Sequence, residues 1–196
     1  NAIEELKGAM KKASAKTYSD LKKAGKTTRY MGHKKVAAAA PMDPKTGQGP
    51  TFESQVHDIQ MAEVEVNMDT GDVRVLHMVT AVDAGTVIHP QNVEGQLEGG
   101  MDQGVGYALR EEYVHGQTKD WVTFKFPTMK TSFDSKVIIR ETPRPKGTLG
   151  ATGIGEMTMV ATAPAVINAI ADACGVWIRH LPATPEKIKA ALAERQ

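Results

Sequence analysis

Two stretches of alternating apolar and polar residues, separated by a short turn, form the clearest pattern along the chain. Residues 55–67 alternate except for a slip at Ala62-Glu63, which is either a β-bulge or an imprecise pattern. Asp69-Thr-Gly-Asp72 supplies the turn, and residues 73–82 are the returning strand. The pattern therefore predicts a β-hairpin over residues 55–82.

An amphipathic helix is predicted after the hairpin, because apolar residues recur every four positions from Val93 to Leu109. The same stretch is rich in glycine, and each glycine inside a helix costs on the order of 1 kcal/mol relative to alanine. Close packing against a neighbouring element or a nearby ligand would each account for these glycines, and both explanations remain open. They are Gly95, Gly99, Gly100, Gly104 and Gly106.

Further helices and strands are predicted on both sides of these elements. Strands interleave with helices without regular βαβ spacing, which predicts an α+β fold of mixed sheets and packed helices. We expect helices over 1–24 and 164–174 and a last one capped by Thr184, strands over 29–40, 111–114, 122–126 and 137–141, and a surface loop over 41–50.

Two domains are expected from this order of elements. Residues 1–54 form an N-terminal helical and strand segment, and residues 55–196 form the C-terminal domain. The chain starts at Asn1 and runs directly into helical sequence, so we expect the first segment to continue from an upstream part of a longer polypeptide.

Composition narrows the class of protein. The net charge is +1, with 24 basic and 23 acidic residues, and neither a signal peptide nor a long apolar run is evident, so we expect neither nucleic acid nor a membrane as a partner. Cys174 is the single cysteine, which excludes a disulfide framework and a set of thiolate ligands within this chain. A buried, reduced thiol in an apolar helix favours a cytoplasmic location.

Gly147-Thr-Leu-Gly-Ala-Thr-Gly-Ile-Gly-Glu156 is the main candidate for chemistry. Its glycine order is neither that of dinucleotide-binding folds nor that of a P-loop. A tight turn with a solvated glutamate would explain it, and so would a loop that presents backbone N–H groups to an anion. A partly desolvated carboxylate at Glu156 would be more basic and would suit a general base.

Other catalytic and metal sites find little support. The six histidines show no HExxH pattern or paired spacing, and the serines lie in no GxSxG elbow. Glu111 and Glu112 are adjacent and would point apart on a helix or strand. Glu156 is therefore one hypothesis among several on spacing alone, and no metal-ligating side chain is predicted.

An ordered set of motifs over residues 55–192 resembles the C-terminal molybdenum-cofactor-binding region of the xanthine dehydrogenase and aldehyde oxidoreductase family. The motifs are Asp83-Ala-Gly85, Val93-Glu-Gly-Gln96, Gly99-Gly100, Gln103-Gly104-Val105-Gly106, Phe126-Pro127, Gly153-Ile-Gly-Glu156 and Leu181-Pro-Ala-Thr-Pro185. The resemblance implies that residues 55–196 are the second molybdopterin-binding domain of a molybdenum hydroxylase.

The family resemblance also implies an activity and a set of site residues. The activity is oxidative hydroxylation of an aldehyde or an N-heterocycle with water as the oxygen source. The Met157-Thr-Met and Leu181-Pro-Ala-Thr-Pro185 segments favour the aldehyde branch. Glu156 would be the catalytic base, and the metal would be held through the pterin. The cofactor contacts would come from Gln103, Gly104, Ala151, Thr152, Gly153, Ile154 and Gly155.

Cofactors and partners follow from the same resemblance. The expected cofactor is molybdopterin in its cytosine dinucleotide form, with iron–sulfur clusters and FAD only on other domains or subunits. The upstream molybdopterin-binding half would complete the site in a hetero-oligomer, with dimerisation left open, and the chain would be active only with that half. Two alternatives remain: a non-catalytic assembly domain that binds a partner subunit, and a simple phosphate- or nucleotide-binding module.

Overall fold

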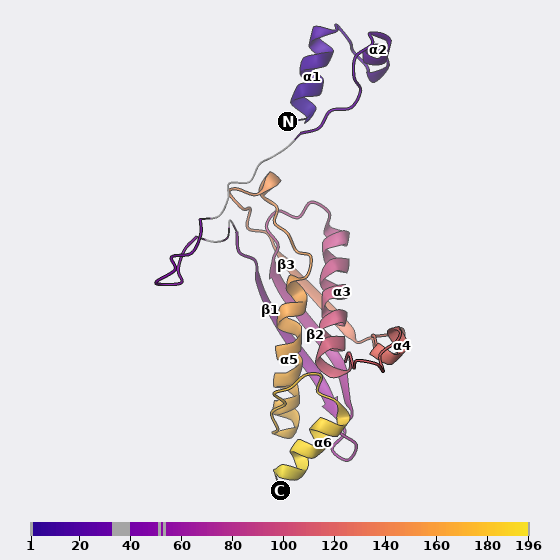
Figure 1. Cartoon of the computed structure of the whole chain (residues 1–196), viewed down its shortest axis with the longest axis vertical. Helices are drawn as coiled ribbons and strands as arrows, with labels where there is room; N and C mark the ends of the chain where they lie inside the picture. Colours follow the sequence, from indigo (N-terminus) through magenta and orange to yellow (C-terminus); the bar gives the residue numbers. More distant parts are fainter. Residues whose placement is uncertain (1, 33–39, 51, 53, 196) are drawn as a thin grey trace. The chain divides into compact units, whose positions relative to one another are not determined.

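The computed structural model describes residues 2–32, 40–50, 52 and 54–195. The chain divides into two compact units, Asn1–Glu53 and Ser54–Gln196 (Figure 1). In chain order the elements are α1 (Ala2–Lys12), α2 (Tyr18–Lys23), β1 (His57–Val66), β2 (Val73–Asp83), α3 (Pro90–Leu109), α4 (Trp121–Phe124), the 3₁₀ turn η1 (Met129–Thr131), β3 (Asp134–Arg140), the 3₁₀ turn η2 (Thr148–Gly150), α5 (Met157–Cys174) and α6 (Pro185–Glu194).

The first unit contains two short helices where the sequence predicted one. α1 ends at Lys12, and α2 begins after Thr17, whose side chain and that of Asp20 cap each other's backbone. This local cap restarts the helix and is the reason that a single helix over 1–24 is wrong. Of the strand predicted over 29–40, residues 29–32 have no regular structure, and 33–39 lie outside the described residues. The loop predicted over 41–50 is confirmed.

The second unit is built on a three-stranded mixed sheet in the order β1-β2-β3. β1 and β2 form the predicted antiparallel hairpin. The register shifts between Glu63 and Val64, but the residue without a partner there is on β2, and β1 alternates without a break. The slip in the sequence pattern arises because the apolar residues change face along β1: Ile59 and Met61 are exposed, whereas Ala62 and Val64 face the helices. β3 runs parallel to β2, and α3 lies in the connection between them. The α+β class predicted from the sequence is confirmed.

Helices α3 and α5 pack side by side against one face of this sheet (Figure 1). Met78 of β2, Met101 of α3 and Ile170 of α5 meet in the main core, and each is at most 1% exposed. A polar network crosses the same layer: Gln60 Nε2 of β1 donates to Thr158 O of α5 at 2.6 Å and to Asp58 Oδ2 at 2.8 Å. The network helps to hold α5 over β1, because a shift of the helix would separate these partly buried polar atoms from their partners.

The glycines of α3 serve different purposes. A Cβ built on Gly100 would lie 2.8 Å from the Thr158 Cβ, and one on Gly104 would overlap Thr162, so these two glycines let α3 approach α5 closely. A Cβ on Gly95 or Gly99 would meet no described atom within 4 Å. Helix packing therefore explains Gly100 and Gly104, whereas Gly95 and Gly99 border open space.

Two of the predicted elements differ in the structure. The strand pair predicted over 111–114 and 122–126 is wrong: Asp120 caps the short helix α4, and the Trp121 ring packs against Phe126 with centroids 5.5 Å apart. α5 begins at Met157, seven residues before the predicted start at Pro164. That proline faces solvent inside the helix, where water can bond the carbonyl that its missing N–H leaves free.

α5 is also long and apolar enough, by length and composition alone, to cross a membrane. The sequence analysis expected no such run. In the structure α5 packs against β1 and α3 with Val166, Ile167 and Ile170 in the core, which accounts for its apolar composition.

We expect Gly104→Ala to destabilise the second unit by about 1–3 kcal/mol, although alanine favours helices, because the new methyl group would overlap Thr162. Thr162 is held by contacts of its Oγ1 with Gln60 Oε1 at 2.7 Å and Thr158 O at 2.9 Å, so it has little freedom to move. Urea unfolding measures the change. The matched variant Gly99→Ala on the same helix should instead stabilise the chain by up to about 1 kcal/mol; equal effects of the two variants would contradict the packing argument.

Candidate functional site

The glycine loop over 147–156 is tied to the end of β2. Thr86 N and Arg144 N both donate to Gly150 O at 2.9 Å, and Gly85 and Ala151 form an antiparallel bridge. Gly150 has φ +81°, and a Cβ there would lie 2.6 Å from Thr86 Oγ1, so this position requires glycine. The first half of the loop is therefore rigidly anchored.

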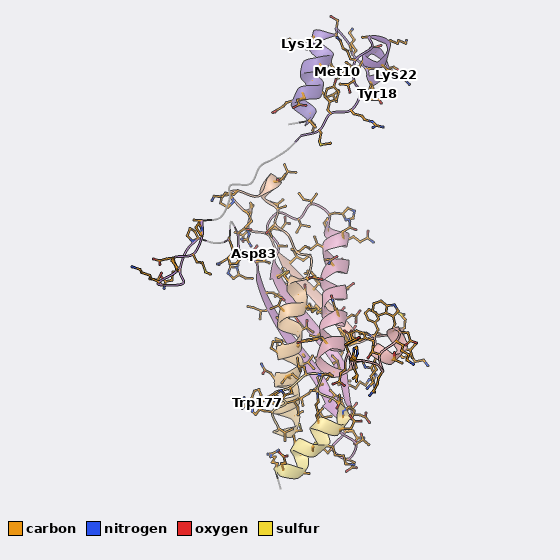
Figure 2. All side chains as sticks on the ribbon, viewed as in Figure 1. Met10, Lys12, Tyr18, Lys22, Asp83 and Trp177 are labelled. Atoms are coloured by element: carbon orange, nitrogen blue, oxygen red, sulfur yellow. The ribbon has the colours of Figure 1, made fainter. Side chains whose placement is uncertain are left out.

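Asp83 is the centre of that anchor (labelled in Figure 2). Its Oδ1 accepts hydrogen bonds from Gly85 N and Thr142 N, both at 3.2 Å, and lies 3.4 Å from Arg144 Nη2. The same guanidinium group donates to Asp83 O at 3.1 Å. Burial by itself would raise the pKa of Asp83, but the hydrogen bonds from Thr142 and Gly85 and the charge of Arg144 outweigh it and hold that pKa below its ordinary value.

The second half of the loop faces the N-terminal half of α3 across a pocket of about 380 Å³. Gln96 Nε2 donates to Gly155 O, which links the helix to the loop. His89 caps α3, with its Nδ1 accepting from Asn92 N at 3.2 Å. The pocket is lined by Ala84, Thr86, Ile88, His89, Asn92, Val93, Gln96, Ala151, Thr152, Ile154 and Gly155.

Four of the predicted cofactor contacts thus line this pocket, namely Ala151, Thr152, Ile154 and Gly155. Gly153 is exposed beside them. Within the described part of the chain, neither the N–H nor the C=O of Gly153 and Ile154 makes a hydrogen bond. Backbone groups in this state need water or a bound molecule as their partner.

Glu156 directly follows the pocket and is the N-cap residue of α5. Its side chain makes no capping hydrogen bond and is exposed. The partial desolvation that the sequence analysis expected for this carboxylate is therefore not provided by this chain. Glu156 is not among the residues that line the pocket, but it is the next residue after Gly155, which is.

Gln103 and Gly104 lie outside the pocket. Gln103 is exposed on α3, two helical turns, or about 10 Å, beyond Gln96 on nearly the same side of the helix. Gly104 is buried against Thr162, so its role in the structure is helix packing. Asn92, Gln96, Gly99 and Gln103 follow one another at spacings of four, three and four residues, and together they form an exposed polar stripe that starts in the pocket.

Sequence reasoning gave no positioning role to Gln96, Asp83 or Arg144. Gln96 and Asp83 stand in motifs that carry the family resemblance, so they were visible without a role. Arg144 carried no signal, because it is 61 residues from Asp83 and only the fold brings their charges together.

The chemistry of the donors restricts what the site can hold. The described residues contain no group of three or more His, Cys, Asp or Glu side chains able to bind a metal ion. The pocket and stripe offer amide side chains and open backbone groups, which suit the ring nitrogens, carbonyls and phosphates of a large organic molecule. These residues fit a metal that is carried by an organic cofactor.

Comparison with known proteins indicates the class of this organic cofactor. Residues 2–132 match the family model described as a molybdopterin cofactor-binding domain. The match includes β1, β2 and α3, and ends before the glycine loop. The chain therefore belongs to the molybdopterin-binding domains of the aldehyde oxidoreductase and xanthine dehydrogenase family of molybdenum hydroxylases.

The relatives are much longer than this chain. It is 37% identical over 178 residues to an aldehyde oxidoreductase of Megalodesulfovibrio gigas, an alignment that covers 90% of this chain and 20% of the relative. The solved structure of aldehyde oxidoreductase from Desulfovibrio gigas superposes with a TM-score of 0.83 at 36% identity, over 90% of this chain and 20% of that one. The nicotine 6-hydroxylase large subunit of Paenarthrobacter nicotinovorans is 35% identical over 133 residues, which are 64% of this chain and 16% of the relative. The chain thus spans about a fifth of the length of these relatives.

The lowered pKa of Asp83 predicts a pH dependence of stability. As the pH falls, the unfolded chain binds the proton before the folded chain does, so the stabilisation by ionised Asp83 is complete above about pH 4 and is lost below it. Asp83→Asn should therefore lower the free energy of unfolding at neutral pH, and the difference from the unaltered chain should shrink as the pH drops below about 4. Asp69→Asn, in the exposed hairpin turn, is the control in urea titrations at each pH and should change the free energy of unfolding only slightly.

Proposed function

We propose that the chain supplies the base-bearing part of a molybdenum hydroxylase that oxidatively hydroxylates an aldehyde or an N-heterocycle with water as the oxygen source. The observation that carries the proposal is that the glycine loop and Gln96 line one pocket, with Glu156 next in the chain, in a protein of this family. Both substrate classes are kept because the relatives include an aldehyde oxidoreductase and a nicotine 6-hydroxylase. The Met157-Thr-Met segment after the base favours the aldehyde.

The pocket and the polar stripe of α3 would hold the cofactor. The open backbone groups of Gly153 and Ile154 would bond its polar atoms, and Gln96 would keep Gly155 in place. Gln103 would make a contact further along the stripe, which suits an extended molecule such as molybdopterin cytosine dinucleotide. The open space at Gly95 and Gly99 supports this course, because no side chain blocks it.

Glu156 would act as the general base. When bound, the molybdenum cofactor supplies oxygen transfer and the two-electron oxidation of the substrate. A carboxylate oxygen of Glu156 would accept the proton that the water-derived oxygen releases, and the start of α5 would fix the position of that carboxylate. Since Glu156 is exposed in this chain, the water-excluding wall of the site has to come from the upstream molybdopterin-binding half.

The rest of the complex would complete the electron path. Iron–sulfur clusters, and FAD where it is present, would belong to other domains or subunits, and the assembly would be a cytoplasmic hetero-oligomer. The length of the relatives supports these partners, and the buried, free Cys174 supports a reducing compartment.

Replacing the base tests the proposal. In the assembled enzyme, Glu156→Gln should lower turnover by about 10²–10⁴-fold, because the amide cannot accept the proton, while molybdenum content stays near normal. Steady-state rates and metal analysis measure both. The control is Glu94→Gln, which removes an exposed carboxylate on a different helix, α3, and should have little effect on turnover or molybdenum content. Undiminished turnover of the Glu156 variant would refute the assignment of the base.

A bulky residue in the stripe tests the course of the cofactor. Gly99→Leu should lower the molybdenum and cytosine nucleotide bound per enzyme, since its side chain would stand between Gln96 and Gln103. The isolated chain should be no less stable, because leucine exceeds glycine in helix propensity by about 0.8 kcal/mol. Glu94→Leu, about 140° around the helix, is the control. Full cofactor content in the Gly99 variant would place the cofactor elsewhere.

A further inference from the structure

The face of the sheet opposite α3 and α5 carries an apolar patch that no described element of the second unit covers. Ile59, Ala81 and Ile138 are direct neighbours across the three strands, and Met61 and Val79 form the next row with Lys136. Ile59 is 71% exposed, Met61 69% and Ile138 47%. We call the five apolar residues of these two rows the outer patch.

Polar rows enclose the outer patch at both ends. Glu63, His77 and Asp134 form one row, in which His77 Nδ1 lies 3.3 Å from Asp134 Oδ2. His57, Asp83 and Arg140 form the other. An apolar centre with a polar rim is the usual anatomy of a protein–protein interface.

The two sides of the outer patch also differ in charge. Glu63 and Glu65 are exposed along β1. β3 exposes Lys136 and Arg140 together with Asp134, whose carboxylate lies beside His77. A complementary surface would therefore be apolar at its centre, basic opposite Glu63 and Glu65, and acidic opposite Lys136 and Arg140.

We infer that the outer patch is the docking surface for the part of the molybdenum hydroxylase that lies outside this chain. The inference rests on the proposed function, and it adds the surface through which the chain joins the remainder. Four-fifths of the length of the aldehyde oxidoreductase relative lies outside the match, so a large partner surface is available in proteins of this family. The pocket and the polar stripe lie on the helical side, so docking at the outer patch leaves the cofactor site accessible.

Oxidation of methionine side chains tests the docking surface without using turnover. In the isolated chain, hydrogen peroxide should oxidise Met61 quickly and Met78 and Met101 slowly, because the last two are 1% and 0% exposed. In the assembled hydroxylase, oxidation of Met61 should slow by about tenfold or more, relative to a methionine peptide added as an internal standard. Equal rates for Met61 in the isolated and assembled protein would overturn the inference.

Substitutions in the outer patch give an independent test. Ile59→Lys with Met61→Lys should leave the urea unfolding of the isolated chain nearly unchanged, since both side chains are exposed, yet weaken co-purification with the rest of the complex by about tenfold or more. Met68→Lys, at a 53% exposed position in the hairpin turn, is the matched control and should assemble normally. Normal assembly of the double variant, or equal loss in the control, would contradict the inference.

Two further readouts separate the possible outcomes. Sedimentation of the isolated chain should show a monomer; a dimer in which Met61 is protected would make the outer patch a self-interface and overturn the inference. The Glu156→Gln complex should protect Met61 as well as the unaltered complex does. Loss of turnover with Met61 protected therefore reports on the base alone, and failure of the base assignment leaves the docking result unaffected.

Discussion

The close approach of α3 and α5 is the constraint on which the candidate site depends. Gly100 and Gly104 leave room for Thr158 and Thr162, and these threonines contact Gln60 of β1 in turn. One interaction set therefore fixes both helices over the sheet. It also sets the distance between Gln96 on α3 and the loop that ends where α5 begins.

A second, electrostatic constraint holds the other end of that loop. At the end of β2, the Asp83 carboxylate accepts two backbone N–H groups and contacts Arg144. Gly150 is held at the same place, because its carbonyl accepts hydrogen bonds from the backbone N–H groups of Thr86 and Arg144. The loop is thus fixed at both ends, while Gly153 and Ile154 between them keep their backbone groups open. Rigid ends with an open middle are what a preformed binding loop requires, since little ordering entropy remains to be lost on binding.

The parts of this structure that sequence reasoning predicted are those set by local rules. The 55–82 hairpin, the stripe of α3 and the Thr184 cap of α6 follow from alternation, helical period and capping. The missed start of α5 has a tertiary cause: residues 157–163 are helical because Thr158 and Thr162 contact Gln60 and pack against α3. Pro164 is tolerated because it faces solvent. The region predicted as a strand pair was missed for a local reason, the capping box of Asp120 and Thr123 that starts α4. For the site, the loop and the position of Glu156 were visible in sequence, whereas its exposure and the Asp83–Arg144 anchor were not.

The exposure of Glu156 and that of the outer patch lead to the same conclusion about this chain. A base on the water-facing edge of a pocket lacks the low-dielectric surroundings that favour proton transfer, and an apolar row across three strands lacks the contacts that would bury it. The two deficits lie on opposite sides of the sheet, so a single flat partner surface would not remedy both. The rest of the hydroxylase would have to contact this domain on two faces, with the outer patch providing attachment and the helical side closing the pocket.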